Sequence, residues 1–331
     1  MPAIWRYAHP QTKAAIGIDW NRVLHSPVGQ QIRAKIQESE IGKLKGLNVI
    51  EDIQRVFITS PGKQDGTAED HAPAVVAVQG NFDLAKLRRL AAEKLAKPTS
   101  YQSVEILEEA EGDGQSTAVA LVSPQTILLG DKSSVRGALD HYFRADPAQA
   151  TDELYVRAAE LAGKHDIWVV AKASLADFSQ KATDQAAFLK DVESVEAGVS
   201  LQKGLALELN LGTKSAESAQ ALAGGVQLML GMLAANQSID NATSALTEKL
   251  HISTDGPLVH MAFSLDQPEI ETALQKLGPT MMPYLAGGED KEGEVRTASN
   301  GNHPALEAPA PKRVIRIHGL EGGVREIPFN Q

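Results

Sequence analysis

Nine histidines are the side chains of this sequence best suited to acid–base chemistry or metal binding. They are His9, His25, His71, His141, His165, His251, His260, His303 and His318. No His-Glu-x-x-His motif occurs, so no helix presents a zinc-binding pair. His251 and His260 are the best candidate pair, because they lie on adjacent predicted strands and could face each other. Isolated histidines are more often structural, and we predict no metal site and no catalytic histidine.

Other reactive signatures are also missing from the sequence. It contains no cysteine, which excludes disulfides, thiolate metal sites and cysteine nucleophiles. No Gly-x-Ser-x-Gly motif occurs, so the commonest serine hydrolase signature is absent. Acidic runs at residues 105–113 and 289–294 are typical of solvated loops. We therefore predict no catalytic residue and no cofactor.

One short segment resembles part of a phosphate-binding loop. Gly212-Thr213-Lys214-Ser215 lies between a predicted strand and a predicted helix. The full motif needs a glycine where this chain has Glu208, and without it the backbone cannot wrap a phosphate. We interpret the segment as a strand-to-helix turn capped by Ser215. Residues 130–134 receive the same interpretation.

Residues 226–235 form a stretch that is apolar nearly all round, and several methionines occur beyond it. Methionine fills irregular space, so the stretch could line a pliable pocket for an apolar ligand. A helix wedged between two domains gives the same pattern, and we favour that interpretation. The candidate lining of such a pocket is Leu228, Met229, Met232, Met281 and Met282.

The bulk properties of the chain bound its architecture and partners. Its 331 residues suffice for about two domains, with 43% hydrophobic and 22% charged residues. Aromatic residues make up only 5%, so the cores must be largely aliphatic. A net charge of −10 disfavours nucleic acids and anionic membrane surfaces as partners. No segment reaches the ~18 consecutive apolar residues of a transmembrane helix.

The predicted elements occur twice in the same order. A strand leads into a helix at residues 12–37 and again at residues 166–190, and further strands and helices follow in each copy. The last helices align by cap and apolar stripe: Asp131, Val135, Ala138 and Leu139 match Asp266, Ile270, Ala273 and Leu274. We predict an α+β fold of two tandem divergent repeats, residues 1–148 and 149–286. Each would be an antiparallel sheet with helices on one face, related to ferredoxin-like folds.

The C-terminal region differs from both copies. Residues 287–312 are rich in Gly, Glu, Asn, Ala and Pro, which predicts a flexible linker. Residues 313–331 predict a β-hairpin around a glycine-rich turn. An isolated hairpin is marginally stable in water, so we expect it to dock, for example by adding to a sheet edge. The candidate interaction tail consists of Val314, Ile315, Ile317, Val324, Ile327 and Phe329.

Several segments together resemble a known family. They are residues 10–31 with Ile16-Gly17-Ile18-Asp19, Gly80-Asn81-Phe82-Asp83 after a valine-rich strand, residues 128–135, and the ending at 313–329. The chain resembles a group of uncharacterised exported proteins from acidobacteria. That family has no established activity, so no functional residue is carried over. The resemblance implies an exported origin, although residues 1–10 lack the pattern of a secretion signal.

These observations favour a non-catalytic binding or protein-interaction module outside the cytoplasm. Its partner would be another protein or a second copy, bound through the C-terminal hairpin, and not a nucleic acid. An alternative is an apolar-ligand or lipid-binding protein that uses the helix at 226–235. A second alternative is an enzyme of unrecognised type, which requires His251 or His260 within hydrogen-bond reach of a carboxylate in a cleft.

Overall fold

The computed structural model describes most of the chain up to residue 270 and two short strands near its end. The described residues are 2–30, 33, 51–63, 72–93, 97–108, 117–144, 152–172, 174, 187–235, 249–270, 314–317 and 325–328. The chain divides into two units, Met1–Met282 and Pro283–Gln331. Each unit is described by itself.

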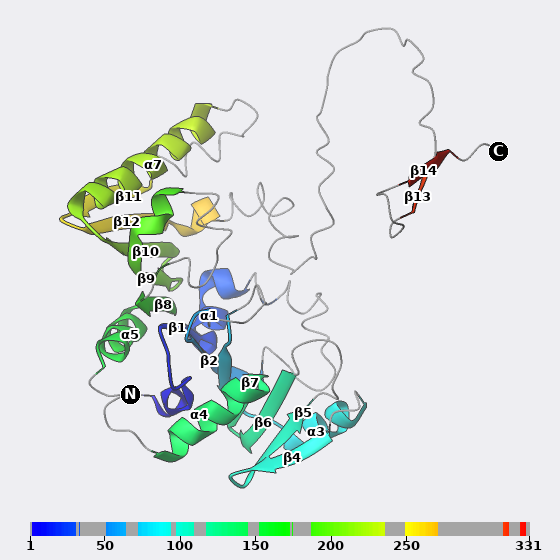
Figure 1. The fold of residues 1–331 in the computed structure, drawn as a ribbon. Helices are drawn as coiled ribbons and strands as arrows, with labels where there is room; N and C mark the ends of the chain where they lie inside the picture. The colour runs from blue at the N-terminus through cyan, green and yellow to red at the C-terminus, as the bar shows by residue number, and fades with distance from the viewer. Residues whose placement is uncertain are drawn as a thin grey trace. The chain divides into compact units, whose positions relative to one another are not determined.

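Twelve strands of the first unit form one antiparallel sheet (Figure 1). They are β1 (Ala14–Asp19), β2 (Ile53–Ser60), β3 (Val75–Gly80), β4 (Lys97–Tyr101), β5 (Val104–Glu108), β6 (Thr117–Ser123), β7 (Thr126–Asp131), β8 (Ile167–Lys172), β9 (Val192–Ser200), β10 (Leu205–Thr213), β11 (His251–Asp255) and β12 (Leu258–Leu265). Across the sheet the order is β11-β12-β10-β9-β8-β1-β2-β3-β7-β6-β5-β4. The predicted α+β class with an antiparallel sheet is therefore confirmed.

Helices pack on this sheet. They are η1 (Ala3–Tyr7), α1 (Trp20–His25), α3 (Leu84–Glu93), α4 (Lys132–Arg144), α5 (Glu153–Lys164), η4 (Ala187–Asp191) and α7 (Ala216–Ala235). Asp131 begins α4 as predicted, because its Oδ1 accepts a hydrogen bond from Ser134 N at 2.8 Å. No helix in the described part of the chain is long and apolar enough to span a membrane.

The N-terminal half of the sheet, β1 to β7, is covered by helices on both faces. Ala118 and Ala120 of β6 belong to a buried cluster that contains Leu139 of α4 and residues of η1 and α5. Leu121, one residue on, belongs to a second cluster that contains Leu84 of α3. Successive residues of a strand point to opposite faces, so α4 and α3 cover opposite sides. The prediction of helices on one face is wrong for this half, because both faces of its strands are apolar.

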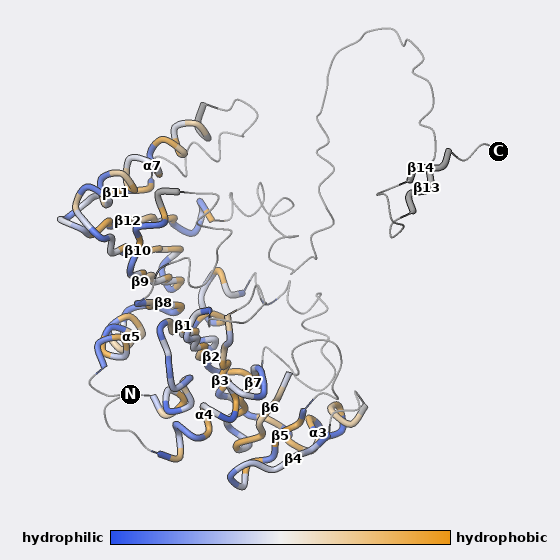
Figure 2. Tube along the Cα trace, viewed as in Figure 1, coloured by the Kyte–Doolittle hydropathy of each residue, from blue (hydrophilic) through white to orange (hydrophobic). Residues whose placement is uncertain are grey.

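The C-terminal half, β8 to β12, is covered differently. Leu211 and Val259 are register partners and pack with Leu222 of α7 on one face. The alternate positions of β10 and β12, such as Glu208 and Ala262, are exposed on the other face. Figure 2 shows hydrophobic and hydrophilic residues alternating along these strands. The face opposite α7 is therefore polar and open to solvent at β10–β12, whereas α5 covers this face at β8 and β9.

The two halves join through β1 and β8, which pair antiparallel with Ile16 opposite Val169. On the face covered by α5, Trp168 lies between Gly17 on β1 and Gly198 on β9. A Cβ atom at Gly17 would lie 2.2 Å from Trp168 Cε2. Gly17 thus provides the space that the buried indole fills.

Outward from this junction the strands follow the same connection order on both sides. The N-terminal half runs β1-β2-β3-β7-β6, and the C-terminal half runs β8-β9-β10-β12-β11. A ferredoxin-like split β-α-β unit inserts another strand between the two strands that its first helix connects. Here β1 and β2 pair directly, so the strand order differs from the predicted ferredoxin-like arrangement.

The N-terminal half carries one additional hairpin at its edge. Residues 97–108 form two strands, β4 and β5, which are joined at Gln102 and Ser103. Both turn residues have positive φ, 48° and 66°. Such turns usually contain Asn or Gly, and the absence of that signal explains why the hairpin was not predicted.

In the second unit, β13 (Val314–Ile317) pairs antiparallel with β14 (Arg325–Pro328). Ile315 lies opposite Ile327 in this register. Of the predicted interaction tail, Val324 and Phe329 lie outside the described residues.

Candidate functional site

The open face of the C-terminal half is the first candidate site. It is made by alternate residues of β10, β12 and β11, and includes Glu208, Asn210, His260, Ala262 and Ser253. His260 Nδ1 lies 2.7 Å from Asn210 Oδ1, within hydrogen-bond distance. The neighbouring strands place small or polar groups around this pair. The arrangement can donate and accept hydrogen bonds over a flat surface.

His251 and His260 lie on adjacent strands, as predicted, but they do not face each other. His251 is the register partner of Ala262, and His260 is the register partner of Ser253. The two histidines are therefore diagonal neighbours, because a strand prediction does not fix the register. The partner of His260 is an amide and not a carboxylate. The arrangement lacks the hydrogen-bonded carboxylate that an acid–base function at His260 would need.

A second polar cluster lies where the two halves join. Asp166, just before β8, is fully buried. Its Oδ2 accepts hydrogen bonds from Leu201 N at 2.7 Å and from Gln202 Nε2 at 3.3 Å. Arg22 Nε of α1 lies 2.8 Å from the other carboxylate oxygen, as an ion pair without hydrogen-bond alignment. This carboxylate therefore ties α1 of the N-terminal half to the β9–β10 turn of the C-terminal half.

The junction continues into the open face through His165. This side chain is buried, and its Nδ1 lies 3.0 Å from Ser200 Oγ. Its Nε2 is buried without a hydrogen-bond partner and lies 3.7 Å from Oε2 of the exposed Glu208. The ring occupies the space above Gly198, where a Cβ would lie 2.2 Å from His165 Cδ2. Glu208 is thus shared by the open face and the junction.

A third cluster lies in the N-terminal half around buried His9. Its Nδ1 accepts a hydrogen bond from Gln11 N at 3.1 Å. Burial lowers the pKa of His9; the Asp131 charge opposes this shift, and His141 adds to it. The ring is therefore held in its neutral form by packing. No described residues place it in an exposed site, and we interpret it as structural.

The phosphate-loop-like segment is a turn, as predicted. Ser215 Oγ accepts a hydrogen bond from Ser218 N at 3.2 Å and so caps α7. Thr213 Oγ1 donates to Pro257 O at 2.8 Å. Lys214 Nζ lies 3.0 Å from Asp191 Oδ1. The polar groups of the segment serve the fold, and its lysine has a carboxylate partner.

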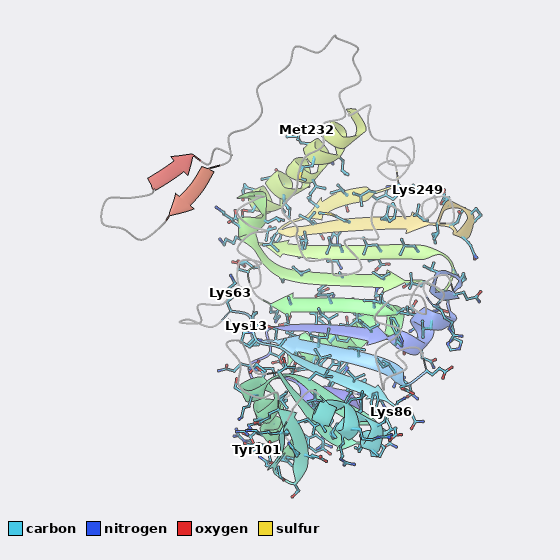
Figure 3. All side chains as sticks on the ribbon, turned by 90° about the vertical axis from the view of Figure 1, so that its right-hand side faces the viewer. Lys13, Lys63, Lys86, Tyr101, Met232 and Lys249 are labelled. Carbon is cyan, nitrogen blue, oxygen red and sulfur yellow. The ribbon has the colours of Figure 1, made fainter. Side chains whose placement is uncertain are left out.

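The predicted apolar lining on α7 lies at the surface. Leu228, Met229 and Met232 are 65%, 48% and 59% exposed, whereas Leu222, earlier in the helix, is fully buried. The N-terminal half of α7 packs on the sheet, and its C-terminal half extends beyond the last strand, where Figure 3 labels Met232. The packing interpretation of residues 226–235 is therefore wrong for Leu228, Met229 and Met232, and the buried part of α7 precedes them. Met281 and Met282 lie outside the described residues.

Sequence reasoning missed the junction cluster. Arg22 and Asp166 are separated by 144 positions, and neither belongs to a motif. In the described part of the chain no group of three or more histidine or acidic side chains is placed to hold a metal ion. Comparisons with protein-family models, with curated proteins and with solved structures find no match to this chain.

Proposed function

We propose that this protein is a non-catalytic protein-interaction module whose binding surface is the C-terminal end of the sheet. One observation carries the proposal: among the described residues, the sheet face that α4 and α5 cover elsewhere has no helix packed on β10–β12, where α7 packs on the opposite face. The uncovered region combines a polar sheet face with an exposed strand and an apolar helix end. Aliphatic and methionine side chains of this kind at a surface are typical of contact sites.

The chemistry of the open face fits binding better than catalysis. His260 is hydrogen-bonded to an amide, and Glu208 is exposed near His165. A flat face with donors and acceptors but no hydrogen-bonded acid–base pair suits a macromolecular partner. The acidic net charge of −10 points to a partner other than a nucleic acid.

Three further proposals complete this function. We propose that residues 1–148 and 149–286 arose by duplication, supported by the shared strand order outward from the β1–β8 junction. We propose an extracytoplasmic location, supported only by the resemblance to exported proteins.

We also propose that the tail hairpin docks on a partner, and deleting residues 312–331 should then change stability or oligomeric state. If neither changed, the tail would have no such role.

A site-specific cross-linking experiment tests the interaction surface. A photo-reactive amino acid replaces Ala262, at the centre of the open face, in the cells that produce the protein. The control position is Lys86, which is exposed on α3 of the N-terminal half. We expect a discrete protein adduct from position 262 that is lost when Glu208 is replaced by Arg. Equal adducts at both positions would contradict the proposal.

An apolar ligand is a second candidate function, supported by the exposure of Leu228 and Met232. Such a ligand would bind to a helix surface and not inside a closed pocket. Binding of a hydrophobic dye that fatty acid displaces, and that Met232→Glu abolishes, would support this function. Dye binding that the substitution leaves unchanged would contradict it.

A further inference from the structure

The two edges of the twelve-stranded sheet differ in their protection against pairing. The β4 edge contains Lys97 and Pro98, and a charged residue and a proline both discourage another strand from adding. The β11 edge has the sequence His-Ile-Ser-Thr-Asp, with four of its five residues exposed. Among the described residues, no strand pairs with the outer side of β11. This edge is therefore open to a further strand.

The apolar end of α7 lies beside the same edge. The helix contacts β11 and β12, and its C-terminal half passes beyond β11 in the view of Figure 3. Leu228, Met229 and Met232 are exposed there. A strand that extended the sheet past β11 would lie on the side toward which this helix projects. The edge and the helix end thus form one continuous surface.

We propose that a second copy of this chain docks at this edge, with β11 pairing antiparallel to the partner's β11 about a two-fold axis at Ser253. This inference rests on the proposed interaction function and names its partner. Centred on Ser253, the strand is self-complementary: His251 of each copy lies opposite Asp255 of the other. An imidazole opposite a carboxylate can form a hydrogen bond or an ion pair, and the two-fold axis creates this pair twice.

The same symmetry accounts for the exposed helix end. A two-fold axis perpendicular to the sheet keeps both copies of α7 on one face of the joined sheet. Their projecting ends then meet across the axis, so the Leu228, Met229 and Met232 side chains of the two copies cover one another. A specific interface buries roughly 1,200 Å² or more, which a five-residue strand pair alone does not supply. The apolar helix ends supply the additional area.

Exchanging the charged residues at positions 251 and 255 in the full-length chain tests the proposed register of β11 against the partner's β11. Sedimentation velocity over a range of concentrations measures the dimer dissociation constant. Asp255→Lys removes both cross-strand pairs and should raise that constant about tenfold or more. Adding His251→Asp restores opposite charges across the axis, and the double variant should return to within about threefold of the wild type. Residues 251 and 255 occupy one strand four positions apart, so the rescue acts between chains.

Two further variants complete the test. Met232→Glu should weaken the dimer because it places charge among the apolar helix ends, and Ser100→Lys on the β4 edge should leave the dimer unchanged. A wild-type chain that stays monomeric, or a double variant that is not rescued, would overturn the inference. A dimer that is lost on deleting residues 312–331 but is unaffected by Asp255→Lys would also overturn it. That result would indicate that the tail, and not β11, forms the dimer contact. A monomer that still cross-links to another protein at position 262 would overturn this inference alone and leave the proposed function standing.

Discussion

The two halves of the sheet share a strand order but differ in what covers them. In the N-terminal half, η1 and α4 lie on one face and α3 lies on the other, so residues at successive positions are both buried. In the C-terminal half, α7 covers one face and α5 covers the other only at β8 and β9, so the alternate residues of β10 and β12 remain exposed or partly exposed. The N-terminal half is therefore covered on both faces, whereas the C-terminal half has an uncovered face at β10–β12 and an edge at β11 without proline or lysine.

The cause of this difference lies in single strands. β6 reads Thr-Ala-Val-Ala-Leu-Val-Ser, which is apolar on both faces and requires cover on both. β10 reads Leu-Ala-Leu-Glu-Leu-Asn-Leu-Gly-Thr, in which leucines alternate with small or polar residues. Only its leucine face gains from burial. The same order of strands is therefore buried on both faces in the N-terminal half and leaves an accessible surface in the C-terminal half.

The largest expected contrast is between a buried and an exposed substitution on the same face of the sheet. Phe57 of β2 is buried and stacks on Trp5, with ring centroids 5.4 Å apart. Phe57→Ala should lower the free energy of unfolding by about 3–5 kcal/mol, because it leaves a cavity. Ser264→Ala on the open face should change it by less than about 0.5 kcal/mol. Urea denaturation measures both, and similar effects would remove the contrast between the halves.

The junction should be the next most sensitive region. Gly17→Ala and Gly198→Ala each place a Cβ 2.2 Å from a ring carbon, of Trp168 and His165 respectively. Each should cost about 1–3 kcal/mol in the free energy of unfolding, because the packed rings must move. Gly224→Ala on α7 is the matched control, since its Cβ would have no atom within 4 Å. That change should be neutral or stabilising by up to about 1 kcal/mol, through helix propensity. Equal losses in all three variants would show that tight packing is not confined to the junction.

The pH dependence of the free energy of unfolding should depend on His9 in the N-terminal half. Because burial lowers the pKa of His9 from its ordinary 6.5, the unfolded chain binds a proton more readily than the folded one. The free energy of unfolding should therefore fall as the pH drops below about 6.5. Protonation would also place a hydrogen on Nδ1, which could then no longer accept the hydrogen bond from Gln11 N. His9→Gln should reduce this loss, measured by urea denaturation at pH 7.5 and pH 5. An unchanged pH dependence in the variant would show that His9 is not its source.

The smallest effect is expected on the open face itself. Glu208 is exposed, and its nearest charged or titratable neighbour is His165 at 3.7 Å. Glu208→Gln should change the free energy of unfolding by less than about 0.5 kcal/mol, because solvent screens exposed charges. The thermal midpoint should stay within a few degrees of the wild type. A loss above 1 kcal/mol would mean that Glu208 serves the junction more than the open face.

Local features were predictable because they depend on neighbours in the chain. Capping by Asp131 and Ser215 follows from one side chain and the next backbone amides, and the structure has both caps. The hairpin at Gln102 was not predictable from its residues, since neither is typical of positive φ. The pairing of Arg22 with Asp166 and the packing of Trp168 over Gly17 join distant segments, which no local pattern indicates.

The α+β class, most of the strands and caps, and the charge that disfavours nucleic acids can all be predicted from the residues alone. These follow from period, capping chemistry and composition, which operate within a few residues. The packing of distant segments sets three other features: the strands form one sheet, one face of β10–β12 has no helix packed on it in the described part of the chain, and α7 extends beyond the edge at β11. Register and burial depend on partners far along the chain. The exposed edge and the open face, on which the proposed function rests, are products of that packing.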